Sequence, residues 1–178
     1  MSAGRPAGRF VLETERLLLR EMGQSDLAAL CAILQDDETM TPPRARCRID
    51  EAQARLDRQM GAARGGWWAV VLRNGRRSMA HLSDADGVRV VEVGYLFRRS
   101  FWHRGYATEA ARVCRDYAFD QVGVDTVYSI IRDTNIPSQK VALRNGMKPE
   151  GSFVKRYRDV DMPHIVYAVS RAVRDGVY

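Results

Sequence analysis

Apolar positions along the chain follow two periods, and each change of period marks the border of an expected element. Apolar runs or alternation predict strands, whereas apolar residues three and four positions apart predict helices. The first part of the chain then contains a strand over 12–21, a helix from Ser25 and a second helix over about 50–60. Ser25 is expected to cap the first helix. The proline-containing segment 36–48 breaks the helical pattern and is expected to be a loop.

Three antiparallel strands are expected in the middle of the chain. Two apolar runs, 67–72 and 78–82, flank Asn74-Gly75. Asn-Gly tolerates the positive φ angles of a tight turn, so this pattern is typical of a β-hairpin. A turn over 84–87 then leads to a third strand, 88–97.

The pattern becomes helical after Gly105 and stays so until Gly123. Small residues form one stripe of this helix and allow it to lie close against a sheet. The stripe consists of Ala107, Ala110, Ala111, Cys114, Ala118 and Gln121. A strand over 124–132 follows the helix.

The last part of the chain predicts one more helix and two strands. Asn135 is expected to cap this helix, Pro137 lies in its first turn, and Gly146 stands where a helix commonly closes. The strands are expected over 147–157 and 163–170, with a turn between them.

The predicted order βααβββαβαββ indicates an α/β (α+β) fold, with a mixed, mostly antiparallel sheet of about seven strands and helices on both faces. The chain has 178 residues, 46% of them hydrophobic, which suffices for one core. Residues 1–9 lack periodicity and are expected to be a flexible N-terminal segment. Residues 10–178 are expected to form a single domain.

The net charge and the cysteine content limit the classes of ligand and partner that the chain is expected to bind. The formal net charge of +6 attracts a polyanion, and nucleic acid, an acidic lipid surface and a phosphate-rich cofactor all fit this description. Cys31, Cys47 and Cys114 form no C-x-x-C motif and indicate neither a disulfide framework nor a metal site. Since no apolar run reaches the roughly 20 residues of a membrane helix, no membrane partner and a cytoplasmic location are expected.

The junction between the strand 88–97 and the next helix carries the candidate chemistry. Gly105 opens the helix, so backbone N–H groups and the positive end of the helix dipole converge there, an arrangement that binds a pyrophosphate. Arg99 and Arg104 can add charge. The pattern also fits an ordinary helix start with a solvated arginine. Neither G-x-G-x-x-G nor G-x-x-x-x-G-K-[ST] is present.

Three motifs resemble the GNAT superfamily of N-acetyltransferases, in particular its ribosomal-protein N-terminal (RimJ/RimL-type) branch. The segment Glu92–Tyr95 followed by Trp102–Ala110 resembles the acetyl-CoA signature. Thr14–Arg20 resembles the first strand of that branch, and Asn135-x-x-Ser138 with Asn145-Gly146-Met147 resembles its fourth helix. The resemblance extends from Thr14 to about Arg171 and implies a GNAT-like fold.

This resemblance implies an N-acetyltransferase that moves an acetyl group from acetyl-CoA to a primary amine, by direct attack in a ternary complex. The amine is a protein N-terminus or a small molecule. The residues expected to bind the cofactor are Tyr95, Leu96, Phe97, Arg99, Trp102, His103, Arg104, Gly105, Tyr106, Ala107, Thr108, Asn135 and Ser138. No metal is expected, and a homodimer is compatible because dimers are common in the family.

Glu92, Tyr95 and Ser138 are the candidate catalytic residues. Glu92 is expected to be the general base, directly or through a water, with a solvated or ion-paired carboxylate as the alternative. Backbone N–H groups around Tyr95 are implied to stabilise the oxyanion. The family often has a tyrosine at the position of Ala142. Ser138 lies one turn earlier on the same helix face and is either the general acid or part of the cap.

The acceptor is expected over the loop 36–48, the second helix and the turn 156–164. Acidic residues in that loop favour a cationic amine, or form a solvated helix end: Asp36, Asp37 and Glu38. Two other functions stay open. Ala142 motivates a catalytically inactive relative that binds coenzyme A as a sensor. The net charge motivates a ribosome- or RNA-associated module, ranked last because no aromatic-basic strand motif is present.

Overall fold

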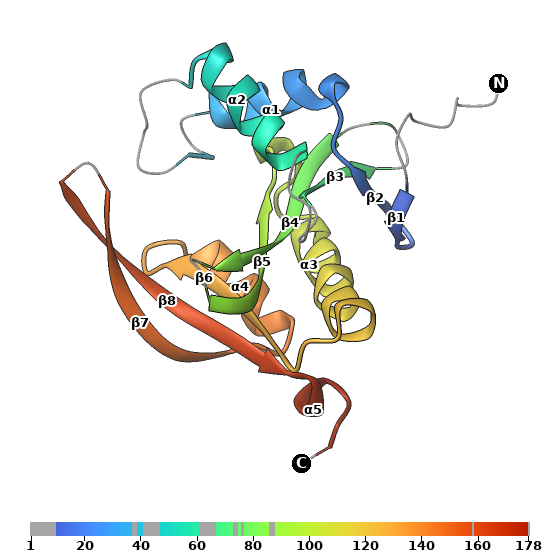
Figure 1. Ribbon diagram of the computed structural model, residues 1–178, viewed down its shortest axis with the longest axis vertical. Helices are drawn as coiled ribbons and strands as arrows, with labels where there is room; N and C mark the ends of the chain where they lie inside the picture. Colours follow the sequence, from blue (N-terminus) through green and yellow to red (C-terminus); the bar gives the residue numbers. More distant parts are fainter. Residues whose placement is uncertain are drawn as a thin grey trace.

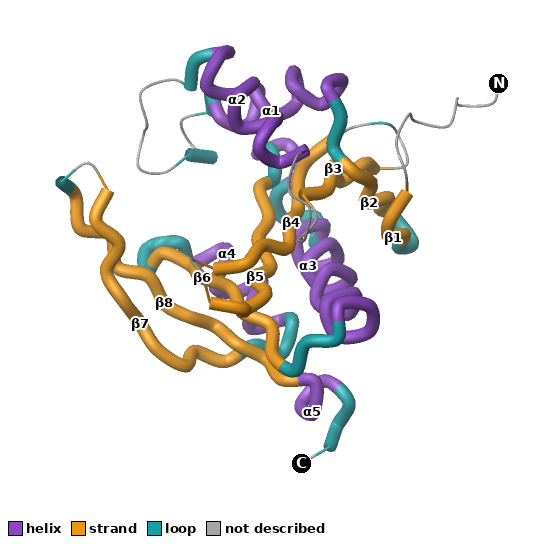
Figure 2. The backbone as a smooth tube through the Cα atoms, viewed as in Figure 1, coloured by secondary structure: helices purple, strands orange, loops and turns teal. Residues whose placement is uncertain are grey.

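The computed structural model describes residues 10–36, 39–40, 47–60, 67–72, 75, 77–85, 88–157 and 159–177. Within these residues eight strands form one sheet in the order β1-β2-β3-β4-β5-β6-β8-β7 (Figure 1). The strands are β1 (Phe10–Glu13), β2 (Leu17–Glu21), β3 (Trp67–Leu72), β4 (Arg77–Ala85), β5 (Val88–Leu96), β6 (Thr126–Arg132), β7 (Lys148–Tyr157) and β8 (Val160–Ser170). The helices are α1 (Leu27–Leu34), α2 (Ile49–Met60), α3 (Tyr106–Tyr117), α4 (Ile136–Arg144) and α5 (Arg171–Arg174) (Figure 2).

The sheet is mixed, as the element order predicts. Its neighbouring strands are antiparallel except for β5 and β6, which are parallel and are connected through α3. The described ladder between β5 and β6 contains only two pairs, Val91 with Val127 and Glu92 with Tyr128. Since β5 continues to Leu96, its last residues have no registered partner on β6.

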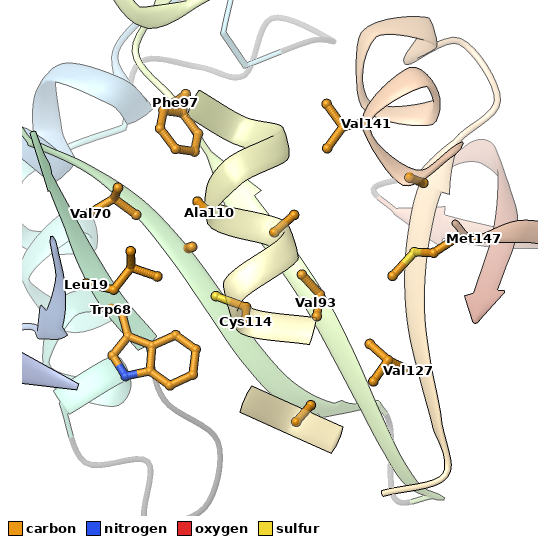
Figure 3. Packing of buried hydrophobic residues seen from close by; sticks show 14 of the residues in the cluster. Leu19, Trp68, Val70, Val93, Phe97, Ala110, Cys114, Val127, Val141 and Met147 are labelled. Carbon is orange, nitrogen blue, oxygen red and sulfur yellow. The ribbon is translucent and has the colours of Figure 1, made fainter. Parts of the chain in front are cut away.

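Helices cover both faces of the sheet because β2 presents apolar side chains to both. Leu17 and Leu19 pack into the cluster that includes α3, and Leu18 packs against the cluster that includes α1 and α2. Most of the predicted small-residue stripe of α3 is confirmed: Gln121 at its end is exposed, but Ala110 and Cys114 are fully buried (Figure 3). Side chains this small let α3 lie close to the strands.

A buried ion pair joins β2, the turn before α1 and β4. Two nitrogens of Arg20 each lie 2.7 Å from an oxygen of Asp26, and Arg77 Nη1 lies 2.9 Å from the same carboxylate. The backbone N–H of Gly23 also donates to it. Burial raises the pKa of Asp26, but the hydrogen bonds from Arg20 and Gly23 outweigh burial and hold this pKa below its ordinary value. The pair thereby fixes α1 to the sheet in charged form.

The helix start at Ser25 was misplaced. Residues 24–26 form a 3₁₀ turn and α1 begins only at Leu27. The side chain that accepts a hydrogen bond at this turn is Asp26, which bonds to the backbone N–H of Gly23. The Asp26 carboxylate, which Arg20 holds in place, is thus the hydrogen-bond acceptor here instead of the Ser25 hydroxyl.

Three expected borders differ in detail. The strand predicted over 12–21 is two strands, because the chain reverses at Thr14. The Thr14 backbone N–H donates to the Leu17 carbonyl, and the Leu17 N–H donates to the Thr14 hydroxyl. The last turn is shorter than predicted: β8 begins at Val160, and Asp159 takes the positive φ of 61° that aspartate tolerates. Two residues of the turn predicted over 84–87, Asp84 and Ala85, belong to β4.

Other predictions fall on segments outside the described residues. These are the flexible segment 1–9, Asn74, most of the loop 36–48 with Asp37 and Glu38, and residues 86–87. The remaining elements lie where they were expected, including the three antiparallel strands β3, β4 and β5.

Candidate active site

Helix α3 begins directly after Gly105, whose φ of +77° is left-handed and easily adopted only by glycine. The first intrahelical bond runs from the Glu109 N–H to the Gly105 carbonyl over 3.0 Å. Gly105 offers no side-chain cap, so the N–H groups of the first turn stay available to a ligand. This helix start has a geometry that suits an anionic group.

Hydrogen bonds and buried aromatic side chains hold the turn between β5 and α3 in place. Trp102 Nε1 donates to the Phe97 carbonyl over 2.8 Å, and the Phe101 N–H donates to the Arg98 carbonyl over 2.8 Å. Phe97 and Phe101 are buried in the core. His103 has a φ of 60°, so two left-handed residues, His103 and Gly105, flank Arg104. The three are exposed on a turn whose base is held in place.

A second anchor comes from the turn between β1 and β2. Arg16 Nη1 donates to the Arg104 carbonyl over 3.0 Å, and Arg16 Nε donates to Glu109 in the first turn of α3 over 2.7 Å. Thr14 also donates to Glu109. Sequence reasoning missed this contact, because Arg16 and Glu109 lie 93 positions apart and neither stands in a pattern that pairs them.

Tyr95 and Ser138, both predicted site residues, are brought together at the end of β5. The Tyr95 hydroxyl donates to the backbone carbonyl of Ser138 over 2.9 Å. Burial raises the pKa of Tyr95 far above its ordinary value, so the phenol remains protonated. Nearby, Ser129 Oγ on β6 donates to the Val93 carbonyl over 2.7 Å. These two bonds connect β5 to β6 and α4 beyond the end of the ladder.

Glu92 and Tyr95 lie on opposite faces of β5. Successive side chains of a strand alternate, and Val93 and Tyr95 face the cluster that includes α3. Leu96 packs against the cluster of α1 and α2, and Glu92 shares its face. Glu92 is half-buried, between Ser83 on β4 and Tyr128 on β6. The structure therefore places the two candidates on different sides of the same strand.

The cap of α4 is Asn135, as predicted. Its Oδ1 accepts from the Ser138 N–H over 3.2 Å, so the Ser138 hydroxyl is not the cap. Ala142, at the position of the family tyrosine, is 2% exposed and packs in the core. Tyr106 packs edge-on against Phe101. Of the hydroxyl candidates, half-buried Ser138 is the one on the helix beside the end of β5.

Residues 16–148 match the profile of the acetyltransferase (GNAT) domain, a span that covers the α3 start and most of the sheet. The chain belongs to the GNAT acetyltransferase family. It is therefore an acyltransferase, as the sequence motifs indicated. The uncharacterised N-acetyltransferase YnaD of Bacillus subtilis is 28% identical over 147 residues, which cover 81% of this chain and 86% of YnaD.

Solved structures with the same fold include several GNAT enzymes. An acetyltransferase from Bacillus anthracis superposes with a TM-score of 0.81 at 23% identity, covering 91% of this chain and 98% of its own. The spermidine N-acetyltransferase of Vibrio cholerae, in complex with CoA and spermine, gives 0.74 at 14% identity, with 89% and 98% covered. RimJ of Mycobacterium smegmatis, in complex with CoA-disulfide, gives 0.71 at 21%, with 90% and 89% covered. These likenesses establish the fold.

The loop 36–48, over which the acceptor is expected, is only partly described. A hollow of about 530 Å³ lies between α1 and the turn before α3, lined by Ala32, Asp36, Arg98, Arg99 and Ser100. Arg99, predicted to bind cofactor, thus lies next to α1 and to Asp36, the first residue of the loop expected to contact the acceptor. On the hairpin of β7 and β8, His164 stacks on Phe153 and its Nδ1 lies 2.7 Å from the Met162 carbonyl.

The described part of the GNAT chain offers no group of three or more His, Cys, Asp or Glu that could hold a metal ion. Its three cysteines are free thiols, and burial raises the pKa of Cys114 far above its ordinary value. In the same described ranges, every helix is too short or too polar to cross a membrane.

Proposed function

We propose that this GNAT chain transfers an acetyl group from acetyl-CoA to a primary amine. The observation that carries this proposal is the left-handed, uncapped start of α3 at Gly105. A pyrophosphate fits such a start because free N–H groups and the helix dipole both favour an anion there. The first-turn amides of Tyr106, Ala107 and Thr108, with the side chain of Arg104, would hold it.

Acetyl-CoA, when bound, supplies a thioester that an amine can attack. In our proposal the end of β5 from Val93 to Leu96, which pairs with β4 but has no registered partner on β6 among the described residues, lies beside the reacting atoms. Its backbone N–H groups near Tyr95 stabilise negative charge on the thioester oxygen. The absence of a registered β6 partner beyond Glu92, within the described ladder, supports this role.

Glu92 is proposed to accept the proton that the amine loses as the new C–N bond forms. Its half-buried place on the face toward α1 and α2, where the acceptor is expected, supports this assignment. A carboxylate positioned beside the attacking amine can act as a general base, because it accepts the proton directly or through a water. Ser138, on the opposite face beside Tyr95, is proposed to donate a hydrogen bond to the sulfur as the C–S bond breaks.

We further propose that the acceptor is a protein N-terminus or a small polyamine-like molecule. The fold neighbours include RimJ and a spermidine N-acetyltransferase, which supports the RimJ/RimL-like branch and an amine acceptor without choosing between the two. Nothing in the comparisons supports a catalytically inactive sensor.

The direct test is product formation. The protein is incubated with acetyl-CoA and a pooled library of polyamines, amino acids and N-terminal peptides, and acetylated products are identified by mass spectrometry. Products that depend on Glu92 are expected. The matched control is Glu21→Gln, which removes an exposed strand carboxylate elsewhere in the sheet. If coenzyme A binds but none of the amines is acetylated, the proposed transfer is wrong.

A further inference from the structure

The first turn of α3 carries a carboxylate that the turn between β1 and β2 surrounds with donors. Thr14 Oγ1 lies 2.5 Å from Glu109 Oε1, and the Arg16 backbone N–H lies 3.2 Å from the same oxygen. Arg16 Nε and Nη2 both contact Glu109 Oε2. Burial raises the pKa of Glu109, but these hydrogen bonds outweigh burial and hold the pKa below its ordinary value. Glu109 is therefore ionised at neutral pH.

Arg16 also lies beside each of the three residues that form the start of α3. Its Nη1 donates to the Arg104 carbonyl over 3.0 Å. Its guanidinium lies 4.8 Å from the centre of the Tyr106 ring. A Cβ added to Gly105 would lie 3.4 Å from Arg16 Nη2. The Arg16 side chain thus lies beside Arg104, Gly105 and Tyr106 in succession.

The bond to the Arg104 carbonyl sets the direction of the next amide. In a trans peptide the C=O and the following N–H point in opposite directions. Because Arg16 holds the Arg104 carbonyl toward itself, the Gly105 N–H points away from Arg16. Left-handed residues, His103 and Gly105, flank Arg104. Without the bond from Arg16, the orientation of the Arg104–Gly105 peptide is less fixed.

The ion pair with Glu109 matters for charge as well as for geometry. An acidic residue in the first turn stabilises a helix through the dipole, but it repels an anionic ligand at the same helix end. Arg16 pairs with this carboxylate and cancels its charge. Removal of Arg16 alone would leave an anion less than two turns from the proposed pyrophosphate position.

We infer that Arg16 is a positioning residue for coenzyme A: it orients the Arg104–Gly105 peptide and neutralises Glu109, so that the start of α3 accepts a pyrophosphate. This inference rests on the proposed function. It gives the Thr14–Arg20 motif a task at the cofactor site in addition to its place in the sheet.

The first test is calorimetric titration with coenzyme A. Arg16→Gln should bind at least about fivefold more weakly than the wild type, and Arg16→Gln with Glu109→Gln should regain part of that loss because the uncompensated anion is gone. Arg115→Gln removes an ion pair on the same helix, far from its start, and should bind normally. A smaller loss in Arg16→Gln, or a double variant that binds no better than Arg16→Gln, overturns the inference.

A second readout separates positioning from a general loss of structure. Acetyl-pantetheine carries the same thioester as acetyl-CoA but no pyrophosphate. Arg16→Gln should lower kcat/KM for acetyl-CoA, mainly through KM, and leave kcat/KM for acetyl-pantetheine unchanged. Equal losses with both donors would assign Arg16 a structural role only. Wild-type protein that binds no coenzyme A would instead remove the proposed function, and the role of Arg16 with it.

Discussion

The Tyr95 hydroxyl on β5 donates a hydrogen bond to the backbone carbonyl of Ser138 on α4 over 2.9 Å. The phenol is partly buried and protonated, and its hydrogen bond holds the N-terminal turn of α4 against β5. Tyr95 therefore acts on the site through the position of Ser138. The two halves of the candidate site are linked by this one side chain together with Ser129.

Tyr95→Phe should release the first turn of α4. Loss of one buried hydrogen bond is expected to lower the free energy of unfolding by about 1 kcal/mol. If Ser138 serves the leaving group, kcat should fall while the Kd for coenzyme A changes little. Urea unfolding and steady-state kinetics measure the two effects. Tyr167→Phe is the matched control, because that phenol contacts the Gln139 side chain of the same helix and not Ser138.

Ser138→Ala tests the leaving-group role directly. Asn135, not Ser138, supplies the cap side chain, so the substitution keeps the cap hydrogen bond and should preserve the melting temperature. We expect kcat to fall by about tenfold or more. Asn135→Ala gives the opposite pattern for stability, with a loss of about 1 kcal/mol. A Ser138→Ala protein with wild-type kcat would leave the sulfur without a partner on α4 and refute the assignment.

Glu92→Gln should keep coenzyme A affinity but lower kcat at neutral pH by roughly 10²- to 10⁴-fold, the usual contribution of a general base. Activity should recover as the pH rises, because the acceptor amine then loses its proton without help. A pH profile of kcat from pH 6 to 10 measures this, with Glu21→Gln beside it. Full activity at neutral pH would identify Glu92 as a structural carboxylate.

Gly105→Ala should weaken coenzyme A binding by more than about tenfold, or 1.4 kcal/mol. The added Cβ is strained at a φ of +77° and comes within 3.4 Å of Arg16. Gly123→Ala is the matched control at the other end of the same helical segment, since its φ is +81° and no atom lies within 4 Å of the added Cβ. Equal affinities for coenzyme A in both variants would move the cofactor site away from Gly105.

The buried pair of Arg20 and Asp26 predicts an acid-sensitive fold. The pKa of Asp26 is lower in the folded chain than in the unfolded one. Its stabilising effect is therefore complete above the unfolded value of about 3.9 and is lost as the pH falls through the lower, folded value. Asp26→Asn should remove this dependence and cost about 3–5 kcal/mol at neutral pH, because Arg20 loses its charged partner.

Urea unfolding of both proteins at a series of pH values measures this effect. The wild type should lose stability relative to Asp26→Asn only in acid. Parallel curves for the two proteins would contradict the assignment of the acid response to Asp26.

Local patterns predicted much of the fold because they report burial. The small side chains of Ala110 and Cys114 recur at helical spacing and are buried where the spacing required. Gly105 and Gly123 mark the two ends of the helical segment because each adopts a left-handed φ. The GNAT resemblance then implied a GNAT-like fold, which the family match and the solved structures confirm.

Long-range polar contacts were beyond the sequence. Nothing in the local pattern pairs Arg16 with Glu109 or Tyr95 with the carbonyl of Ser138. The first contact depends on how the turn between β1 and β2 meets α3, and the second on how β5 meets α4. The split of the first strand was missed for a related reason. Its turn depends on hydrogen bonds that Thr14 makes to Leu17, and threonine is itself a residue that favours strands.

The two-pair ladder between β5 and β6 divides the sheet into five strands on one side and three on the other, within the described residues. The division is a seam that two side-chain bonds reinforce, from Ser129 and Tyr95. A molecule that lies along the end of β5 would supply partners for main-chain groups that β6 does not reach. If coenzyme A binds there, as proposed, it should strengthen the junction between the two parts of the sheet, so resistance to unfolding should increase with coenzyme A concentration.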